Sequence, residues 1–130
     1  MHGYDQVELS RLQRECYFGI GTSYSLVING SINLMLADKF DHSIRKEPRT
    51  MVGQKHDGTF VMVVVDGRTT SSLGMTAKEQ ASFMLSLGCK NAVNLDGGGS
   101  STMYFGGKVV NKPSDGTPRK VGSVLLARRV

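Results

Sequence analysis

Two aspartates, each followed by glycine, end apolar runs of this chain. Asp66 follows the run FVMVVV at 60–65, and Asp96 follows the run AVNL at 92–95. A strand holds such a carboxylate in place, and a glycine beside it lets a ligand approach the backbone. If the two strands are neighbours, both carboxylates lie at the same sheet edge, where catalytic groups commonly collect. Asp66 and Asp96 are therefore our candidate catalytic carboxylates.

The stretch NLDGGGSST at 94–102 adds groups that suit an anionic ligand. Three successive glycines weaken any helix or strand, and a plain turn needs only one. Their amide groups can converge on an anion, and the hydroxyls that follow add donors. Arg68, two residues after Asp66, can bind phosphate through two parallel hydrogen bonds. The predicted ligand-binding residues are Arg68, Gly97, Gly98, Gly99, Ser100, Ser101 and Thr102.

Other interpretations of these residues are simpler or different. An Asp-Gly pair often just closes a turn, which is the structural alternative for Asp66 in particular. The Walker A pattern with its lysine is missing, and so is the GxSxG pattern of a nucleophile elbow. The three histidines show no zinc-ligand spacing. The sequence requires no cofactor, although Asp66 and Asp96 can share a hard cation such as calcium.

Length and composition narrow the class of protein. The chain has 130 residues, 39% of them hydrophobic, and fits one domain. Its formal charge of +5 favours anionic partners, but no nucleic-acid-binding motif is present and aromatic residues make up only 7%. Nothing approaches the roughly 18 apolar residues of a membrane span, and the N-terminus lacks the layout of a signal peptide. We therefore expect neither a nucleic-acid partner nor a membrane span.

One helix is strongly predicted, at 76–87. Thr76 and Glu79 form a capping-box pattern, and Gly88 supplies a left-handed stop. A second helical stretch is expected near residues 7–14. The rest of the pattern indicates strands at 24–28, 31–36, 50–53, 60–65, 92–95, 102–105, 108–111 and 121–127.

These elements predict an α+β fold with a mixed sheet of about seven or eight strands. The run at 60–65 is apolar without alternation, so we expect that strand to be buried on both faces. The strand at 60–65, the helix at 76–87 and the strand at 92–95 can form one βαβ crossover. Asn29-Gly30 and Gly106-Gly107 are typical hairpin turns.

Five motifs occur in a specific order along the chain. They are PRTMVG (48–53), VVVDGR (63–68), GMTAKEQ (74–80), NLDGGGSSTM (94–103) and VVNKPSDG (109–116). This ordered set resembles the phosphodiester glycosidase family, and the likeness runs from about Tyr24 to Arg129. We therefore interpret residues 1–130 as one domain of this type, with residues 24–130 family-like and residues 1–23 atypical.

The resemblance implies a hydrolase that cleaves the bond between a sugar's anomeric carbon and a phosphodiester. The sugar would be similar to N-acetylglucosamine, carried on a bacterial surface polysaccharide or related glycan. Arg49 matches the family's arginine in PRT-x-x-G, Asp66 and Arg68 its VDGR, and Asp96 to Ser101 its LDGGGSS loop. Asp66, Asp96 and Arg49 are thus the expected catalytic residues, with either aspartate as base or nucleophile.

Two further hypotheses stay open. Family members usually carry an Asn-Gly-Gly-Phe-Phe-like motif upstream, and none precedes Tyr24. This difference favours a fragment of a longer polypeptide, a minimal enzyme, or a non-catalytic carbohydrate-binding module of a phage tail or cell-surface assembly. A structural homo-oligomerisation domain is the third hypothesis. In each case we expect an extracellular, cell-envelope or phage-particle setting.

Overall fold

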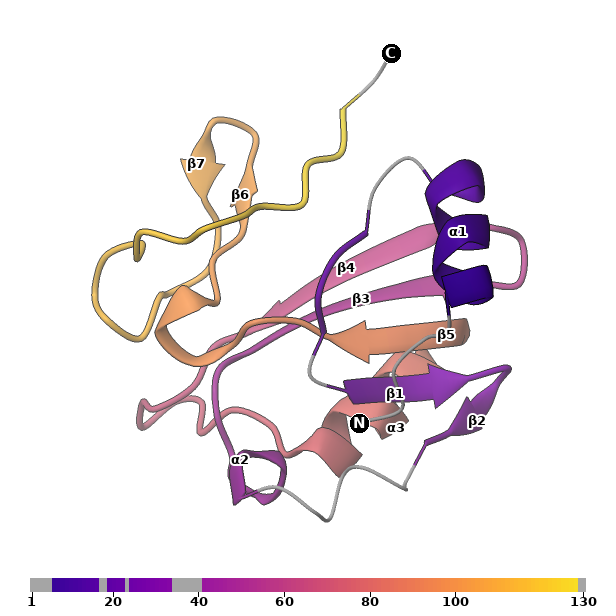
Figure 1. Ribbon diagram of the computed structural model, residues 1–130. Helices are drawn as coiled ribbons and strands as arrows, with labels where there is room; N and C mark the ends of the chain where they lie inside the picture. The colour runs from indigo at the N-terminus through magenta and orange to yellow at the C-terminus, as the bar shows by residue number, and fades with distance from the viewer. Residues whose placement is uncertain (1–5, 17–18, 23, 34–40, 129–130) are drawn as a thin grey trace.

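The computed structural model describes residues 6–16, 19–22, 24–33 and 41–128, which form an α+β fold (Figure 1). The helices are α1 (Gln6–Glu15), α2 (Asp41–Ile44), α3 (Ala77–Ser86) and the 3₁₀ helix η1 (Gly98–Ser100). The strands are β1 (Tyr24–Ile28), β2 (Ser31–Ile32), β3 (Arg49–Lys55), β4 (Phe60–Val65), β5 (Cys89–Asn94), β6 (Tyr104–Phe105) and β7 (Lys108–Val109). The predicted fold class and both predicted helices are confirmed.

Five strands form one sheet in the order β2-β1-β5-β3-β4, and β6 and β7 form a separate hairpin. Every pairing among the described strands is antiparallel, so no parallel pair joins them as a mixed sheet would require. The predicted crossover from β4 through α3 to β5 exists, but the two strands are not neighbours because β3 lies between them. Both run antiparallel to β3, and therefore their C-terminal ends lie on the same side of the sheet as the start of β3. This side, where the strands end, is called the sheet edge below.

α3 covers one face of the sheet and builds the core with it (Figure 1). The capping box is present: Thr76 Oγ1 accepts from Glu79 N at 3.2 Å, and Glu79 Oε2 accepts from Thr76 N at 2.8 Å. Gly88 follows the helix with a φ of 81°, which is the predicted left-handed stop. The buried core consists of Tyr24, Leu26, Val27, Met51, Ala77, Ala81, Met84, Cys89 and Ala92.

The apolar strand β4 is not buried on both faces, contrary to the sequence-based expectation. It is the edge strand of the sheet, and Phe60 and Met62 are 68% and 39% exposed. The alternate residues Val61, Val63 and Val65 pack against the core. Val64, on the face away from α3, is half-buried, so this strand is covered mainly on its α3 side and its unbroken apolar pattern does not reflect full burial on two sides.

The predicted strand at 121–127 is also wrong. These residues form no strand, and Val124 and Leu126 are each 78% exposed. Strand propensity describes fit to a pleated, half-buried surface, and a strand forms only where a free edge accepts it. The predicted strand at 31–36 is confirmed at Ser31–Ile32, while residues 34–36 lie outside the described residues. Within the described ranges, no helix is long and apolar enough to cross a bilayer.

Candidate active site

The three predicted catalytic residues meet at one edge of the sheet. Arg49 begins β3 and pairs with Val65, the last residue of β4, so Asp66 lies beside the start of β3. β5 ends at Asn94 at the same edge, and Asp96 follows two residues later. From the sequence, Asp66 and Asp96 were expected at one sheet edge only if β4 and β5 were neighbours. In the structure β3 stands between them and brings Arg49 into the same region.

The glycine loop contacts the PRT segment at residues 48–50, where β3 begins. Leu95 N donates to Thr50 O at 2.9 Å, and Gly98 N donates to Pro48 O at 2.9 Å. The chain then closes the η1 turn, in which Ser101 N donates to Gly98 O at 3.1 Å. The loop between β5 and the β6–β7 hairpin is therefore fixed by backbone hydrogen bonds to the PRT segment.

Gly97 and Gly98 are required for different reasons. A Cβ on Gly97 would lie 2.9 Å from Pro48 O, so the loop could not approach the PRT segment so closely. Gly98 has a φ of 59°, which side chains disfavour, and its open side faces Arg68, with Nη2 3.4 Å from the place of a Cβ. These two glycines let the loop contact backbone on one side and a guanidinium on the other.

Gly99 is buried beneath an ion pair that the sequence did not reveal. A Cβ on Gly99 would overlap Asp115 Oδ2 and lie 2.6 Å from Arg119 Cζ. Arg119 Nε and Nη2 lie 2.8 and 2.7 Å from Asp115 Oδ2. The segment after the β6–β7 hairpin thus folds back over the third glycine. The three glycines therefore contact three separate parts of the chain.

Asp66 is held by the far end of the hairpin. Its Oδ1 accepts a hydrogen bond from Asn111 Nδ2 at 3.0 Å, and Lys112 N lies 3.0 and 3.1 Å from the two carboxylate oxygens. Its main-chain oxygen accepts from Ser72 Oγ at 2.6 Å. The carboxylate of Asp66 therefore fixes the chain after β7 to the end of β4.

Asn111 belongs to the motif VVNKPSDG but was not predicted to be a site residue. Its Nδ2 donates to Asp66 Oδ1 and to Ser101 O, each at 3.0 Å, and its Oδ1 accepts from Met103 N at 2.8 Å. This one side chain joins the ends of β4, the glycine loop and the hairpin. Its place in the motif VVNKPSDG was the signal that could have identified it.

Asp96 is exposed, in contrast to Asp66. No hydrogen-bond or ion-pair partner for its carboxylate is present among the described residues. The residue follows β5 and precedes Gly97, near the ends of the strands that carry Asp66 and Arg49. Of the two predicted carboxylates, Asp96 is the one that is available to a ligand.

Arg49 is buried, with only 4% of its surface exposed. Nε donates to Met75 O at 2.7 Å, Nη2 to Arg45 O at 2.8 Å, and Nη1 to the Tyr24 hydroxyl at 3.2 Å. Gln80 Nε2 also donates to that hydroxyl at 3.2 Å. Through these contacts the guanidinium joins β3 to the start of β1, to the segment after α2 and to the segment before α3.

Arg68 lies on the solvent side and is held by Glu47. Arg68 Nε is 2.6 Å from Glu47 Oε2, and the arginine backbone has a φ of 60°. Glu47 is itself fixed by two backbone hydrogen bonds to Met75, at 3.3 and 3.0 Å. The Nη end of Arg68 faces Gly98, as described above. Glu47 precedes Pro48 of the PRT motif and was not selected from the sequence.

The three predicted hydroxyls occupy different environments. Ser101 is 1% exposed, and its Oγ accepts from Thr50 Oγ1 at 3.3 Å. Thr102 Oγ1 is buried and has no partner within the described part of the chain. Ser100 is half-buried, and its backbone N donates to Gly97 O at 3.1 Å. Of these three residues, only Ser100 has a hydroxyl that lies within reach of solvent without a structural contact.

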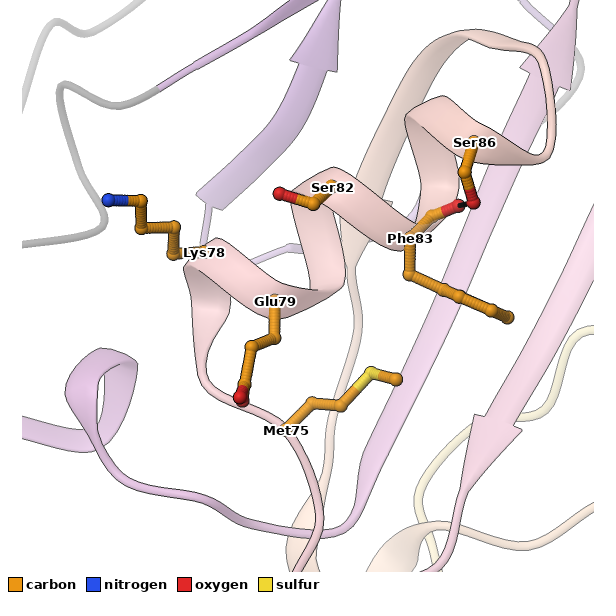
Figure 2. Close-up of a pocket in the computed structure, with 6 residues that line it drawn as sticks. All are labelled: Met75, Lys78, Glu79, Ser82, Phe83 and Ser86. Atoms are coloured by element: carbon orange, nitrogen blue, oxygen red, sulfur yellow. Dashed lines mark hydrogen bonds between the residues drawn. The ribbon is translucent and has the colours of Figure 1, made fainter.

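An open cavity of about 540 Å³ lies on the outer side of α3, away from these residues (Figure 2). Met75, Phe83 and Glu79 are among the side chains that line it. No predicted site residue lines it. Across the described ranges no group of three or more His, Cys, Asp or Glu side chains could hold a metal ion. The calcium site stays a prediction.

Comparison with known families decides what kind of chain this is. The model of the family described as phosphodiester glycosidase matches residues 4–128. The chain belongs to the phosphodiester glycosidase family. The resemblance inferred from the five motifs is thereby confirmed, and the match extends over nearly the whole chain.

Relatives of this phosphodiester glycosidase-family chain include a protein of an integrated phage and animal enzymes. The SPbeta prophage-derived protein YomE of Bacillus subtilis is 50% identical over 80 residues, which are 62% of this chain and 12% of YomE. The Bos taurus N-acetylglucosamine-1-phosphodiester α-N-acetylglucosaminidase is 39% identical over 84 residues, 59% of this chain and 16% of the enzyme. The chain thus spans less than a fifth of the length of either relative.

A solved structure shares this fold. The catalytic domain of the zebrafish N-acetylglucosamine-1-phosphodiester α-N-acetylglucosaminidase, auto-inhibited by its pro-peptide, superposes with a TM-score of 0.62. The two are 30% identical, and the superposition covers 73% of this chain and 34% of the zebrafish chain. The family fold therefore extends well beyond the part that corresponds to these 130 residues.

Proposed function

We propose that this chain carries the reacting edge of a hydrolase that cleaves the bond between the anomeric carbon of a sugar and a phosphodiester. One observation supports this proposal most strongly. An exposed carboxylate without a structural partner, that of Asp96, stands beside a glycine loop whose Gly98 faces the Nη end of Arg68. A carboxylate and an anion-binding group at one edge match the two parts of a glycosyl phosphate.

The reaction adds water to the anomeric carbon and breaks the bond from that carbon to the phosphate oxygen. The phosphomonoester leaves with the bonding electrons as a stable anion, and therefore it needs little help from a general acid. Asp96 either attacks the anomeric carbon directly or takes a proton from the water that attacks it. Arg68 binds the phosphate oxygens. Asp66 and Arg49 hold this edge in shape through the contacts described above.

We further propose that the sugar is similar to N-acetylglucosamine and belongs to a bacterial surface polysaccharide or related glycan, outside the cell or on a phage particle. The names of the animal relatives support the sugar, and the prophage origin of YomE supports the phage or bacterial setting. The formal net charge of +5 suits an anionic polymer.

A hydrolysis assay tests the proposal. The wild-type chain is incubated with a panel of sugar 1-phosphodiesters, and free sugar and phosphomonoester are measured by proton and phosphorus NMR. We expect release by the wild type and none by Asp96→Asn, and the configuration of the first sugar released distinguishes direct attack from attack by water. Binding of the glycans by the wild type without turnover would contradict the hydrolase and favour a carbohydrate-binding module.

A further inference from the structure

The two exposed arginines at the glycine loop share one arrangement. Arg68 directs Nε to the carboxylate of Glu47 at 2.6 Å, and its Nη end faces Gly98. Arg119 directs Nε to the carboxylate of Asp115 at 2.8 Å, and its Nη2 lies over Gly99. Consecutive glycines are thus each covered by a guanidinium that a carboxylate holds. Arg119 was not predicted from the sequence to be a site residue.

The Arg119–Asp115 pair has unused hydrogen-bonding capacity. Both contacts of the guanidinium go to one oxygen, Asp115 Oδ2, at 2.8 and 2.7 Å. Arg119 Nη1 has no partner among the described residues, and a guanidinium offers five donors in a planar fork. The side chains are 49% and 36% exposed, so the pair contributes only about 0–1 kcal/mol and exchanges readily with another anion.

Gly99 gives this contact its meaning. A side chain there would displace the pair, because a Cβ would overlap both Arg119 and Asp115. These atoms are the ends of two flexible side chains, so a side chain at residue 99 would push the pair away from the loop. Glycine instead lets the guanidinium lie directly on the loop that carries Asp96.

We propose that Arg119 is a second anion-binding residue of this site, and that Asp115 occupies its guanidinium until the substrate's phosphate takes its place. This inference rests on the proposed function and names a specificity residue for it. Arg68 and Arg119 then bind the phosphate from two sides of the loop at 98–99. The 113–119 segment becomes part of the substrate site instead of a surface turn.

The test compares two arginines under the same substitution. Arg119→Lys keeps the charge but removes the planar fork, and Arg128→Lys makes the same change at another exposed arginine. Titration with inorganic phosphate is followed by amide NMR. We expect the Kd to rise about tenfold for Arg119→Lys and to stay within about twofold for Arg128→Lys. Equal affinity in both variants overturns the inference, whether or not the chain hydrolyses anything.

Kinetics give a readout that a structural role would not move. With a sugar 1-phosphodiester, Arg119→Lys should raise KM about tenfold and leave kcat within about twofold. With an aryl glycoside that lacks phosphate, the same variant should match the wild type. An equal loss on both substrates would show a structural role and overturn the inference.

Asp115→Asn tests the exchange itself and does not depend on the fold of the arginine variant. Asparagine keeps the shape of the side chain but no longer competes as an anion for the guanidinium. We expect phosphate to bind about threefold more tightly, as the loss of a weak ion pair allows. Weaker binding in Asp115→Asn would mean that Asp115 does not occupy the position of the ligand, and would overturn the proposed exchange.

Discussion

The ends of β4 and β5 present the same pair of residues, Asp followed by Gly, in opposite situations. At the end of β4, three donor contacts from Asn111 and Lys112 occupy the Asp66 carboxylate. At the end of β5, the Asp96 carboxylate is exposed and has no partner among the described residues. A carboxylate that organises the structure and one that is open to solvent therefore lie at one sheet edge, and hydrogen bonds distinguish them where motifs do not.

The largest expected effect is on activity at the β5 end. Asp96→Asn should lower kcat/KM for a sugar 1-phosphodiester by at least about 1000-fold, or about 4 kcal/mol in the barrier. The melting temperature should change by less than about 2 °C, because no structural contact is lost. Sugar release and differential scanning calorimetry measure the two quantities. Loss of stability with retained activity would reverse the assignment of the two aspartates.

The start of β3, between the two ends, should be the most sensitive to unfolding. Arg49→Met fills a similar space but removes the donor to Arg45 O, a donor to the buried Tyr24 hydroxyl and one of the two donors to Met75 O. We expect a loss of about 3 kcal/mol in the free energy of unfolding, because hydrogen bonds from a charged group contribute about 1.5–3 kcal/mol. Urea titration measures it. A variant as stable as the wild type would show that this arginine is not a structural support.

The β4 end should respond to substitution mainly through stability. Asp66→Asn replaces a charged acceptor of the Lys112 N–H by an amide and places an NH2 group opposite Asn111. A loss of about 2 kcal/mol in the free energy of unfolding is expected. Urea titration of Asp66→Asn beside Asp96→Asn gives the comparison directly. If both variants unfold at the same urea concentration, the distinction between the two strand ends is not real.

The smallest effect is expected at the start of α3, away from both strand ends. The backbone N–H of Thr76, and then Lys46, hold the pKa of Glu79 below its ordinary value of 4.5. A lowered pKa in the folded state means that this stabilisation is present above about pH 4.5 and is lost as the pH falls through the folded-state value.

Glu79→Gln tests that expectation. The wild type should be more stable by less than about 1 kcal/mol at pH 7, and the difference should shrink toward pH 3. Thermal unfolding at several pH values measures it, and sugar release should be unchanged. A difference that grows as the pH falls would have the wrong sign for a capping carboxylate.

Local signals predicted the elements that local interactions build. The capping box and Gly88 defined α3, and the positive φ values of Asn29 and Gly30 follow from their hairpin motif. The strand at 121–127 failed because a strand also needs an edge to pair with. The position of β3 between β4 and β5 was not predicted either, because the pairing partners of a strand depend on the whole sheet.

The sequence predicted that the candidate residues lie close together, but not which structural contacts each of them makes. Motif order identified Arg49, Asp66 and the glycine loop, and all of them lie at one sheet edge. Burial of Arg49 and occupation of Asp66 depend on contacts with residues 25–46 positions away, which no local pattern records. Glu47 and Arg119 were missed because a charge on the surface and a charge over a binding loop are identical in the sequence.

The three glycines also have a consequence for how this edge forms during folding. Gly97 contacts residue 48, Gly98 contacts residue 68, and Gly99 contacts residues 115 and 119. Each contact joins segments well separated along the chain, so each requires the closure of a long loop. The edge is completed only when all of these segments have docked. The loop at 94–102 can therefore take its final shape only after most of the chain has folded. We expect the site to form as one of the last events of folding.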